Sequence, residues 1–287
     1  MKKLTIITIV LLILTGCQTQ KEEDTLNISV SFYPLSYFTQ EIVGKHGTVF
    51  NVLDKGSDAH DYEPSIQDRI QIEESDIFIH NGFHLEHWVD KTLDSIKNDN
   101  LVVVETSFGI DPILRGQHPD PHIWLDPFLA ATQIDNIYEA IIYKDPEHLE
   151  YYEKRYLDLK TKMHDLQASF NESLIDAKGK SIVLEHEIFS YISSRYGFKQ
   201  VSISGILPEG EPSIQQLSQV VEYINEHEIK HMLLSKYDAT KVIDTISKEA
   251  DVNVLLIDSM EIGNGDFDYF KIMKANLESI KEALQDE

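Results

Sequence analysis

The stretch HPDPHIWLDP (118–127) sets a histidine, His122, in a backbone stiffened by prolines on both sides. Proline locks its own φ angle and restricts the residue before it, so the imidazole has few positions to sample. A metal ligand that is held in place before the ion arrives loses less entropy on binding. His122 is therefore a candidate metal ligand, and a polar turn residue is the alternative.

Three more candidates stand where predicted strands end. His60 follows the second strand in GSDAHDYEPS (56–65), His186 ends a strand in the second half of the chain, and Asp258 closes the last strand. In open parallel sheets, ligands bind beyond the carboxyl ends of the strands. Three imidazoles and one carboxylate would make a four-ligand cation site. The four residues form no helix motif, so a satisfied polar loop residue remains the alternative for each histidine alone.

Other carboxylates lie near these ligands. Glu187 follows His186 directly, and Asp126 lies in the proline-rich stretch. Neighbours in a strand point to opposite faces, so we expect Glu187 or Asp126 to orient an imidazole instead of binding the ion. Glu261, in the loop SMEIGNGD after the last strand, is the alternative to Asp258 as the fourth ligand.

A second group of histidines lies in HNGFHLEHW (80–88), which holds His80, His84 and His87. Three imidazoles within eight residues could form a second metal site. The alternative is that this segment is structural, as the end of one strand and the start of a helix. In either case His80 could approach the main site.

Short β-branched runs alternate with amphipathic stretches along the chain, which predicts parallel sheets flanked by helices. Several of the runs are apolar throughout, as expected of strands covered on both faces. The predicted strands are 26–32, 48–53, 76–81, 101–107, 181–187, 200–206, 231–236 and 252–258. Predicted helices include 64–75, 212–228 and 239–250.

A long helix separates the two sets of strands. Apolar residues recur every three or four positions from Leu149 to Leu174, with Asp145-Pro146 as an N-terminal signal and Gly179 as a stop. The helix would be a rod of roughly 50 Å. Its narrow stripe fits either a coiled-coil dimer or a bridge across two lobes, and we predict the bridge in a monomer. The predicted division is a lobe at 26–144, the helix at 145–178 and a lobe at 179–287.

The first residues predict export from the cytoplasm. Lys2 and Lys3 precede an apolar run that is too short to span a membrane, and small residues follow it. The run ends at Leu14, and Leu14-Thr15-Gly16-Cys17, with the only cysteine in the chain, is similar to the bacterial lipobox. We therefore predict a signal peptide at 1–16, lipidation of Cys17, and a polar tether at 17–25 on the outer face of the cell membrane. An ordinary signal peptide with a chance cysteine is the alternative.

The net charge of the chain limits the classes of molecule that it is expected to bind. The formal net charge is −24 at pH 7, so we do not expect nucleic acid as a partner. A single cysteine allows neither an intrachain disulfide nor a cysteine-based metal site.

The mature chain resembles the zinc- and manganese-binding lipoproteins and periplasmic proteins that feed metal ABC importers, the metal-specific solute-binding proteins. Many zinc-specific relatives carry a long histidine-rich insertion before the DPH motif, which is only LRGQHPDPH here. The matching segments are SFYPLSYFTQEIVG (31–44), GSDAHDYEPS (56–65), DIFIHNGFHLEHW (76–88), DPHIWLDP (120–127), HEIFSYISSRYGF (186–198) and ILPEGEPSIQQL (206–217).

The resemblance implies two α/β lobes bridged by a long rigid helix, with a metal in the interlobe cleft and a membrane permease as partner. It carries ligand roles onto His60, His122, His186 and Asp258. Imidazole-rich sites suit zinc, and manganese prefers oxygen, so we expect Zn²⁺ with Mn²⁺ as the alternative. A zinc hydrolase is a further alternative, but a fourth protein ligand would fill the position that a catalytic water needs. The last alternative is a surface adhesin that a bound metal stabilises.

Overall fold

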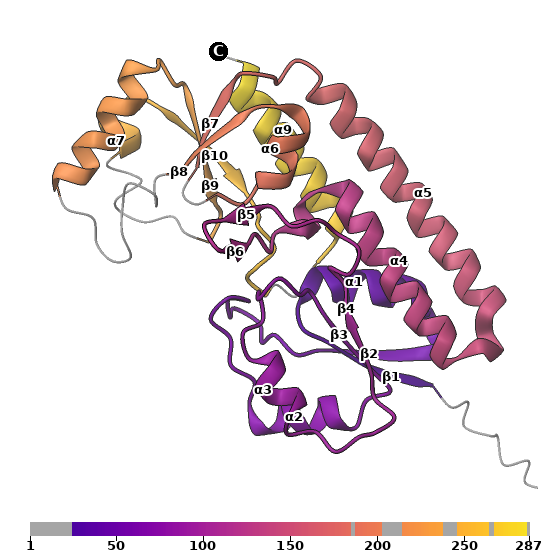
Figure 1. Cartoon of the computed structure of the whole chain (residues 1–287). Helices are drawn as coiled ribbons and strands as arrows, with labels where there is room; N and C mark the ends of the chain where they lie inside the picture. The colour runs from indigo at the N-terminus through magenta and orange to yellow at the C-terminus, as the bar shows by residue number, and fades with distance from the viewer. Residues whose placement is uncertain (1–24, 185–186, 203–213, 238–245, 264–266, 286–287) are drawn as a thin grey trace, which may run out of the picture.

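Two parallel four-stranded sheets organise the chain (Figure 1). The computed structural model describes residues 25–184, 187–202, 214–237, 246–263 and 267–285. Each of the eight predicted strand segments overlaps one strand, and the predicted α/β class is confirmed. The strands are β1 (Leu26–Val30), β2 (Gly47–Asn51), β3 (Ile77–His80), β4 (Val102–Glu105), β7 (Ser181–Leu184), β8 (Lys199–Ser202), β9 (His231–Ser235) and β10 (Asn253–Ile257).

In both sheets the spatial order of the strands differs from their order along the chain, because crossover connections link parallel strands. The order is β2-β1-β3-β4 in the N-terminal sheet and β10-β9-β7-β8 in the C-terminal sheet. In β1, Ile28 and Val30 pair with Ile77 and Ile79 of β3, and all four side chains are buried. Residues two apart in a strand point to the same face, and these four side chains belong to the core cluster that also contains Leu35 of the first helix in the chain. The unpredicted β5 (Leu114–Arg115) and β6 (His118–Pro119) form an antiparallel ribbon between the two sheets (Figure 1).

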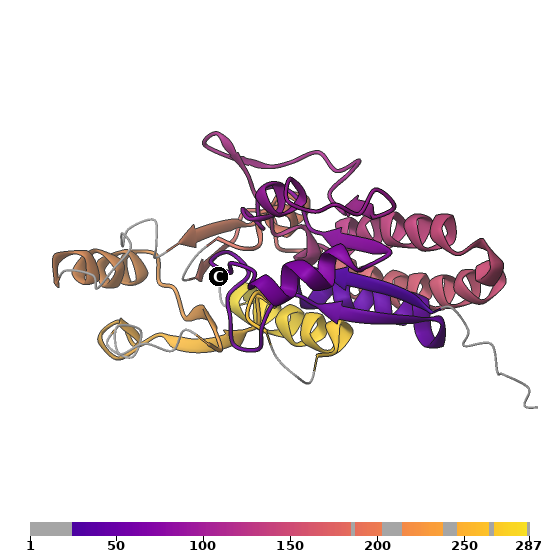
Figure 2. The same cartoon turned by 90° about the horizontal axis from the view of Figure 1, so that it is seen from below.

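Helices of very different lengths surround the sheets. In Figure 2 the helix α7 lies at one end of the molecule, far from the N-terminal sheet. Among the described helices, none is long and apolar enough to cross a membrane. The helices are α1 (Tyr33–Val43), α2 (Ile66–Glu73), α3 (Val89–Leu93), α4 (Pro127–Lys144), α5 (Leu149–Ser173), α6 (Ser190–Tyr196), α7 (Ile214–Glu226) and α9 (Tyr269–Gln285), with single 3₁₀ turns η1 (Gly44–His46), η2 (Ile123–Leu125) and η3 (Pro146–His148).

The long helix α5 is shorter than predicted, with 25 residues. Residues 146–148 form the 3₁₀ turn η3 before it. Asp145 does not cap this turn with its side chain; the carboxylate instead accepts hydrogen bonds from the hydroxyl of Tyr152 and the ring of His148. At the other end the helix stops at Ser173, well before Gly179.

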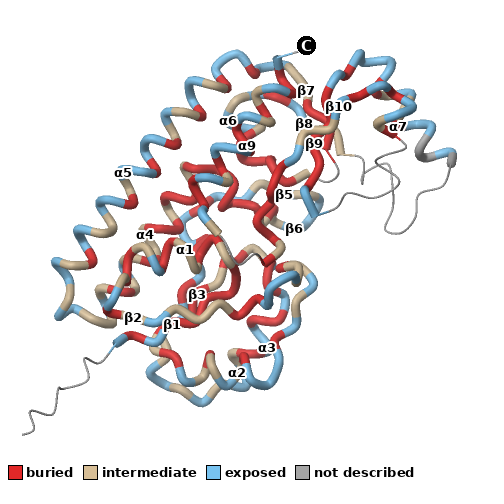
Figure 3. The backbone as a smooth tube through the Cα atoms, turned by 180° about the vertical axis from the view of Figure 1, so that it is seen from behind, coloured by how far each residue is buried: buried red, intermediate tan, exposed pale blue. Residues whose placement is uncertain are grey.

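The apolar face of α5 is part of one core that runs through both halves of the molecule. Figure 3 shows buried residues along the inner side of this helix and exposed ones along its outer side. The core cluster contains Ile28 of the N-terminal sheet, Met163 of α5 and Leu233 of the C-terminal sheet. A shared core ties the two sheets together, which favours a stiff molecule. The division at 144/145 and 178/179 stays a prediction, and residues 1–24 with Cys17 lie outside the described residues.

Candidate metal centre

Three side chains from distant parts of the sequence converge between the two sheets. The Nε2 atoms of His60 and His122 lie 2.9 and 2.7 Å from the same oxygen, Oε1 of Glu261. One ligand atom from each residue lies within 4.8 Å of the other two. His122 and Glu261 are buried, whereas the side chain of His60 is 39% exposed. The group is therefore reached from solvent on the side of His60.

Backbone hydrogen bonds hold the loop of His60 against the loop of Glu261. His60 follows β2, and Glu261 follows β10 in the other sheet. The two loops pair as a short antiparallel bridge between Asp58 and Ile262. The hydrogen bonds run from Ala59 N to Glu261 O (3.1 Å), from Gly56 N to Gly263 O (3.0 Å) and from Gly263 N to Ser57 O (3.2 Å).

Close approach of the two loops requires a glycine at position 263. A Cβ atom there would lie 2.6 Å from a ring carbon of Tyr33 and 2.7 Å from the carbonyl oxygen of Asp54. We expect Gly263→Ala to lower the free energy of unfolding by about 1–3 kcal/mol, because the loops must part. Thermal unfolding measures this, with Ser57→Ala as a control in the facing loop that keeps the backbone bonds. An unchanged melting temperature would contradict the prediction.

A buried carboxylate fixes the ring of His122. Oδ1 of Asp120 lies 2.6 Å from Nδ1 of His122 and 3.0 Å from its backbone nitrogen. Asp120 is fully buried. A carboxylate on Nδ1 sets the tautomer that offers Nε2 to a metal. This role of Asp120 was not predicted from the sequence, although the spacing Asp-Pro-His indicates it: a carboxylate two residues before a histidine can reach both its backbone nitrogen and its ring.

Two carboxylates flank the His122 ring, and they change its protonation. Burial alone lowers the pKa of His122, but the negative charge of Glu261 and the hydrogen bonds to Asp120 and Glu261 raise the pKa from 6.5 to about 9. Burial also raises the pKa of Asp120, but the hydrogen bonds and charge of His122 outweigh it, and that pKa lies well below its usual range. In the metal-free protein the His122 ring is therefore protonated at neutral pH, and the Nε2 proton occupies the place of a cation.

The turn that presents Glu261 is held by its neighbours. Met260 is buried with a φ angle of 65°, a conformation that residues other than glycine rarely adopt. Its backbone nitrogen donates to Oδ1 of Asp258 at 2.9 Å. The carbonyl of Ser259 accepts a hydrogen bond of 2.8 Å from the indole of Trp124. These contacts direct the Glu261 carboxylate toward the two imidazoles.

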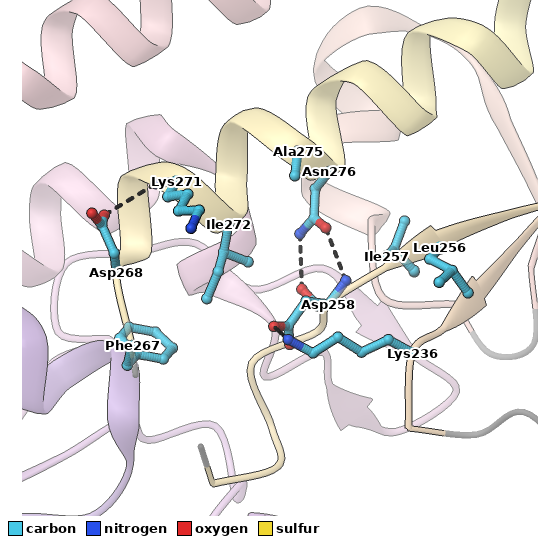
Figure 4. Close-up of a pocket in the computed structure, with 10 residues that line it drawn as sticks. All are labelled: Lys236, Leu256, Ile257, Asp258, Phe267, Asp268, Lys271, Ile272, Ala275 and Asn276. Carbon is cyan, nitrogen blue, oxygen red and sulfur yellow. Dashed lines mark hydrogen bonds and ion pairs between the residues drawn. The ribbon is translucent and has the colours of Figure 1, made fainter. Parts of the chain in front are cut away.

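The structure does not bring Asp258 to the same point. Its Oδ2 atom lies 2.5 Å from Nζ of Lys236, and the amide of Asn276 bonds both its backbone nitrogen and its carbonyl oxygen (Figure 4). Asp258 and Lys236 line a cavity of about 700 Å³ between β10 and α9, and neither imidazole lines it. Asp258 thus supports the turn of Glu261 and pairs with a lysine.

The remaining predicted residues have other neighbours. Asp126 accepts a hydrogen bond from Phe128 N as the N-cap of α4 and pairs with Arg195, so it does not touch an imidazole of the group. Glu187 pairs with Arg115. His186 lies outside the described residues.

The second group of histidines, His80, His84 and His87, lines one cavity of about 190 Å³, but its ligand atoms do not converge as those of the first group do. His84 and His87 are exposed, and His87 pairs with Glu63 at 3.1 Å. Within the described residues, the group of His60, His122 and Glu261 is the only one whose ligand atoms are close enough for one ion. The predicted role of His80, His84 and His87 as a metal site gains no geometric support.

The donor set fits a small divalent cation. Ligand atoms at about 2.0–2.1 Å in a tetrahedral zinc site lie roughly 3.3 Å from one another. The nitrogen–oxygen distances of 2.7 and 2.9 Å are slightly shorter, so each pair must open by about half an ångström once the ion replaces the protons. Imidazole nitrogens with one carboxylate oxygen are donors that zinc accepts readily.

Comparisons with known proteins agree with this geometry. The family model of the zinc-uptake complex component A, periplasmic (ZnuA), matches residues 28–283. The chain is 31% identical to the high-affinity zinc uptake system protein ZnuA of Bacillus subtilis, over 91% of this chain and 88% of that protein. It is 29% identical to the zinc-binding lipoprotein AdcA of Streptococcus pneumoniae, all of this chain aligning with 62% of that protein.

A solved structure resembles the whole arrangement. It is the crystal structure of the Zn(II)-bound ZnuA-like domain of Streptococcus pneumoniae AdcA, with a TM-score of 0.83 and 29% identity. The match covers 91% of this chain and 99% of that domain. The chain therefore matches in fold the ZnuA-like domain of a longer protein.

Proposed function

Because this chain belongs to the family of the periplasmic component A of zinc-uptake complexes, we propose that it captures zinc outside the cytoplasm and delivers it to the permease of an ABC importer. The observation that carries the proposal is the convergence of His60 and His122 on one oxygen of Glu261. His186 is the proposed fourth ligand. We propose Glu261 in place of Asp258, because Asp258 pairs with Lys236.

The donor set supports zinc over manganese as cargo. Two imidazoles and one carboxylate are donors of intermediate softness, whereas manganese favours oxygen ligands. His122 binds through Nε2 once that atom loses its proton, and Asp120 keeps the Nδ1 proton in place. The relatives named above carry zinc in their names. Manganese remains a competitor that the protein binds more weakly.

Capture and handover need little movement. A core that runs through both sheets and α5 limits their relative motion, so the exposed His60 side is the route for the ion. The proposed partner is the membrane permease, which takes the ion from the loaded form. We propose that the protein acts as a monomer, held at the outer face of the cell membrane by a lipid on Cys17.

The family consists of solute-binding proteins, and we propose no enzymatic activity for this chain. Four protein ligands leave no position for the water that a zinc hydrolase activates. A metal that only stabilises a surface protein would be needed for folding. In a transport receptor, the metal-free chain stays folded and binds the ion again, because the shared core holds it together.

Zinc loading tests the proposal directly. Protein purified without added metal, stripped with a chelator and titrated should bind one zinc ion per chain, more tightly than manganese, and should stay folded while empty. Elemental analysis, competition titration and circular dichroism of the empty form measure these properties. Zinc binding that survives alanine at both His60 and His122, or an unfolded empty form, would overturn the proposal.

A further inference from the structure

Arg115 connects Asp120, the residue that orients His122, to residues of the C-terminal half of the chain. Arg115 lies in β5 of the ribbon between the sheets. Its Nε atom donates to Oδ2 of Asp120 at 2.7 Å, which leaves Oδ1 of the same carboxylate for His122. Its Nη1 atom lies 2.5 Å from the carboxylate of Glu187. Its Nη2 atom donates to the carbonyl oxygen of Glu187 at 2.6 Å and to the hydroxyl of Ser190.

We propose that Arg115 is a positioning residue for metal capture, because it fixes Asp120 between the His122 ring and the segment that leads into α6. The proposal rests on the proposed function and adds a residue to its site. Within the part of the chain that the structure describes, Arg115 itself contacts no proposed metal ligand. It acts through Asp120, whose two oxygens divide between the arginine and the histidine.

The geometry of the contact favours an arginine over a lysine. The planar guanidinium directs three nitrogens at three partners at once, whereas an ammonium is a point charge on a flexible stem. Asp120 is fully buried, and the side chain of Arg115 is 34% exposed. A buried carboxylate with one fixed cationic partner has a single favoured orientation, and that orientation holds the ring of His122. Without Arg115, Asp120 can turn, and the imidazole loses its fixed direction.

A second arginine provides a matched control. Arg195 of α6 pairs with Asp126, which is also fully buried, and the side chain of Arg195 is also 34% exposed. Both arginines join α6 or the residues before it to the segment 115–126, Arg115 through Glu187 and Ser190 and Arg195 through Asp126. Asp126 caps α4 and touches no imidazole of the group. Removing either arginine takes the arginine partner from a buried aspartate, but only Asp120, the partner of Arg115, contacts His122.

The experiment compares Arg115→Met with Arg195→Met in the full mature chain. We expect Arg115→Met to weaken zinc binding by about tenfold to a hundredfold, with faster dissociation into a chelator. The visible absorption of the cobalt-loaded protein should change in Arg115→Met and stay unchanged in Arg195→Met, although both variants lose thermal stability. Arg115→Lys should restore part of the affinity and provides a folded variant if Arg115→Met does not fold.

A double variant tests the route through Asp120. In the background of Asp120→Asn, Arg115→Met should have little further effect on zinc affinity, because the oriented carboxylate is already lost. Wild-type affinity and cobalt absorption in both Arg115 variants, equal losses in Arg115→Met and Arg195→Met, or additive losses in the double variant would overturn the role of Arg115. A wild-type chain that binds no zinc would overturn the proposed function as well. The wild-type measurement therefore distinguishes a failure of the proposed function from a failure of the Arg115 proposal alone.

Discussion

Replacing Glu261 by glutamine should weaken zinc binding by at least on the order of 100-fold, whereas Asp258→Asn should cost less than about tenfold. Structural zinc sites bind with about 10–16 kcal/mol in total, so one of four ligands contributes roughly 3 kcal/mol. Glu261 offers one oxygen to both imidazoles. Among the described residues, the Asp258 carboxylate contacts Met260 N in the turn and pairs with Lys236, and the amide oxygen of asparagine still accepts the first of these bonds.

Comparing the two variants distinguishes a metal ligand from a residue that only holds the ligand's turn in place. Competition of each variant with a chromogenic zinc chelator gives both affinities under the same conditions. Asp68→Asn is a control carboxylate that lies in the capping box of α2. A large loss in Asp258→Asn with a small loss in Glu261→Gln would exchange the two roles. It would mean that Lys236 releases Asp258 to the ion when the metal arrives.

The strands could be predicted because runs of apolar residues indicate buried strands. The first three of the four residues of β3 and the middle three of the five residues of β9 are apolar, since helices cover both faces of each sheet. The ends of the helices were harder to predict than the strands. Asp145 and Pro146 have the sequence of a helix start, but the carboxylate is taken by Tyr152 and His148, whose positions depend on packing. Local sequence gives the signal, and tertiary contacts decide which donor reaches it.

Two histidines of the candidate site could be predicted from the sequence, and the structure places them together. His186 stays a prediction, and the choice between the two carboxylates was left open. His60 and His122 come together because both follow strand ends that meet between the sheets, as the rule for parallel sheets predicts. The choice between Asp258 and Glu261 depends on the turn at Met260, whose positive φ angle has no sequence signal. Lys236, the partner that keeps Asp258 occupied, comes from the neighbouring strand segment, and a single sequence does not pair the two.

The protonated ring of His122 gives zinc binding a pH dependence that extends above the usual range of histidine. The pKa of His122 is about 9 in the metal-free protein, raised from 6.5 by Glu261 and Asp120 against the effect of burial. Zinc must displace the Nε2 proton, so its apparent affinity should rise about tenfold per pH unit between pH 6.5 and 8. About one proton should leave His122 for each zinc bound at pH 7.5.

A dye in weakly buffered solution measures this proton release, and chelator competition at several pH values measures the slope. His122→Ala should lose the release from this ring, and His227→Ala, at an exposed position outside the group, should keep it. Release well below one proton with a flat affinity from pH 6.5 to 8 would contradict the prediction.

The stability of the empty protein should change in the opposite direction. Because the folded pKa of His122 lies above its unfolded value of 6.5, the ion pairs of the protonated ring stabilise the fold fully below pH 6.5, and this contribution is lost as the pH rises through 9. The empty chain should therefore melt at a lower temperature at pH 8.5 than at pH 6.5, while zinc binding strengthens. His122→Ala should reduce this difference. The same two carboxylates thus hold a proton when the site is empty and favour a cation in its place, which keeps the donors aligned in both states.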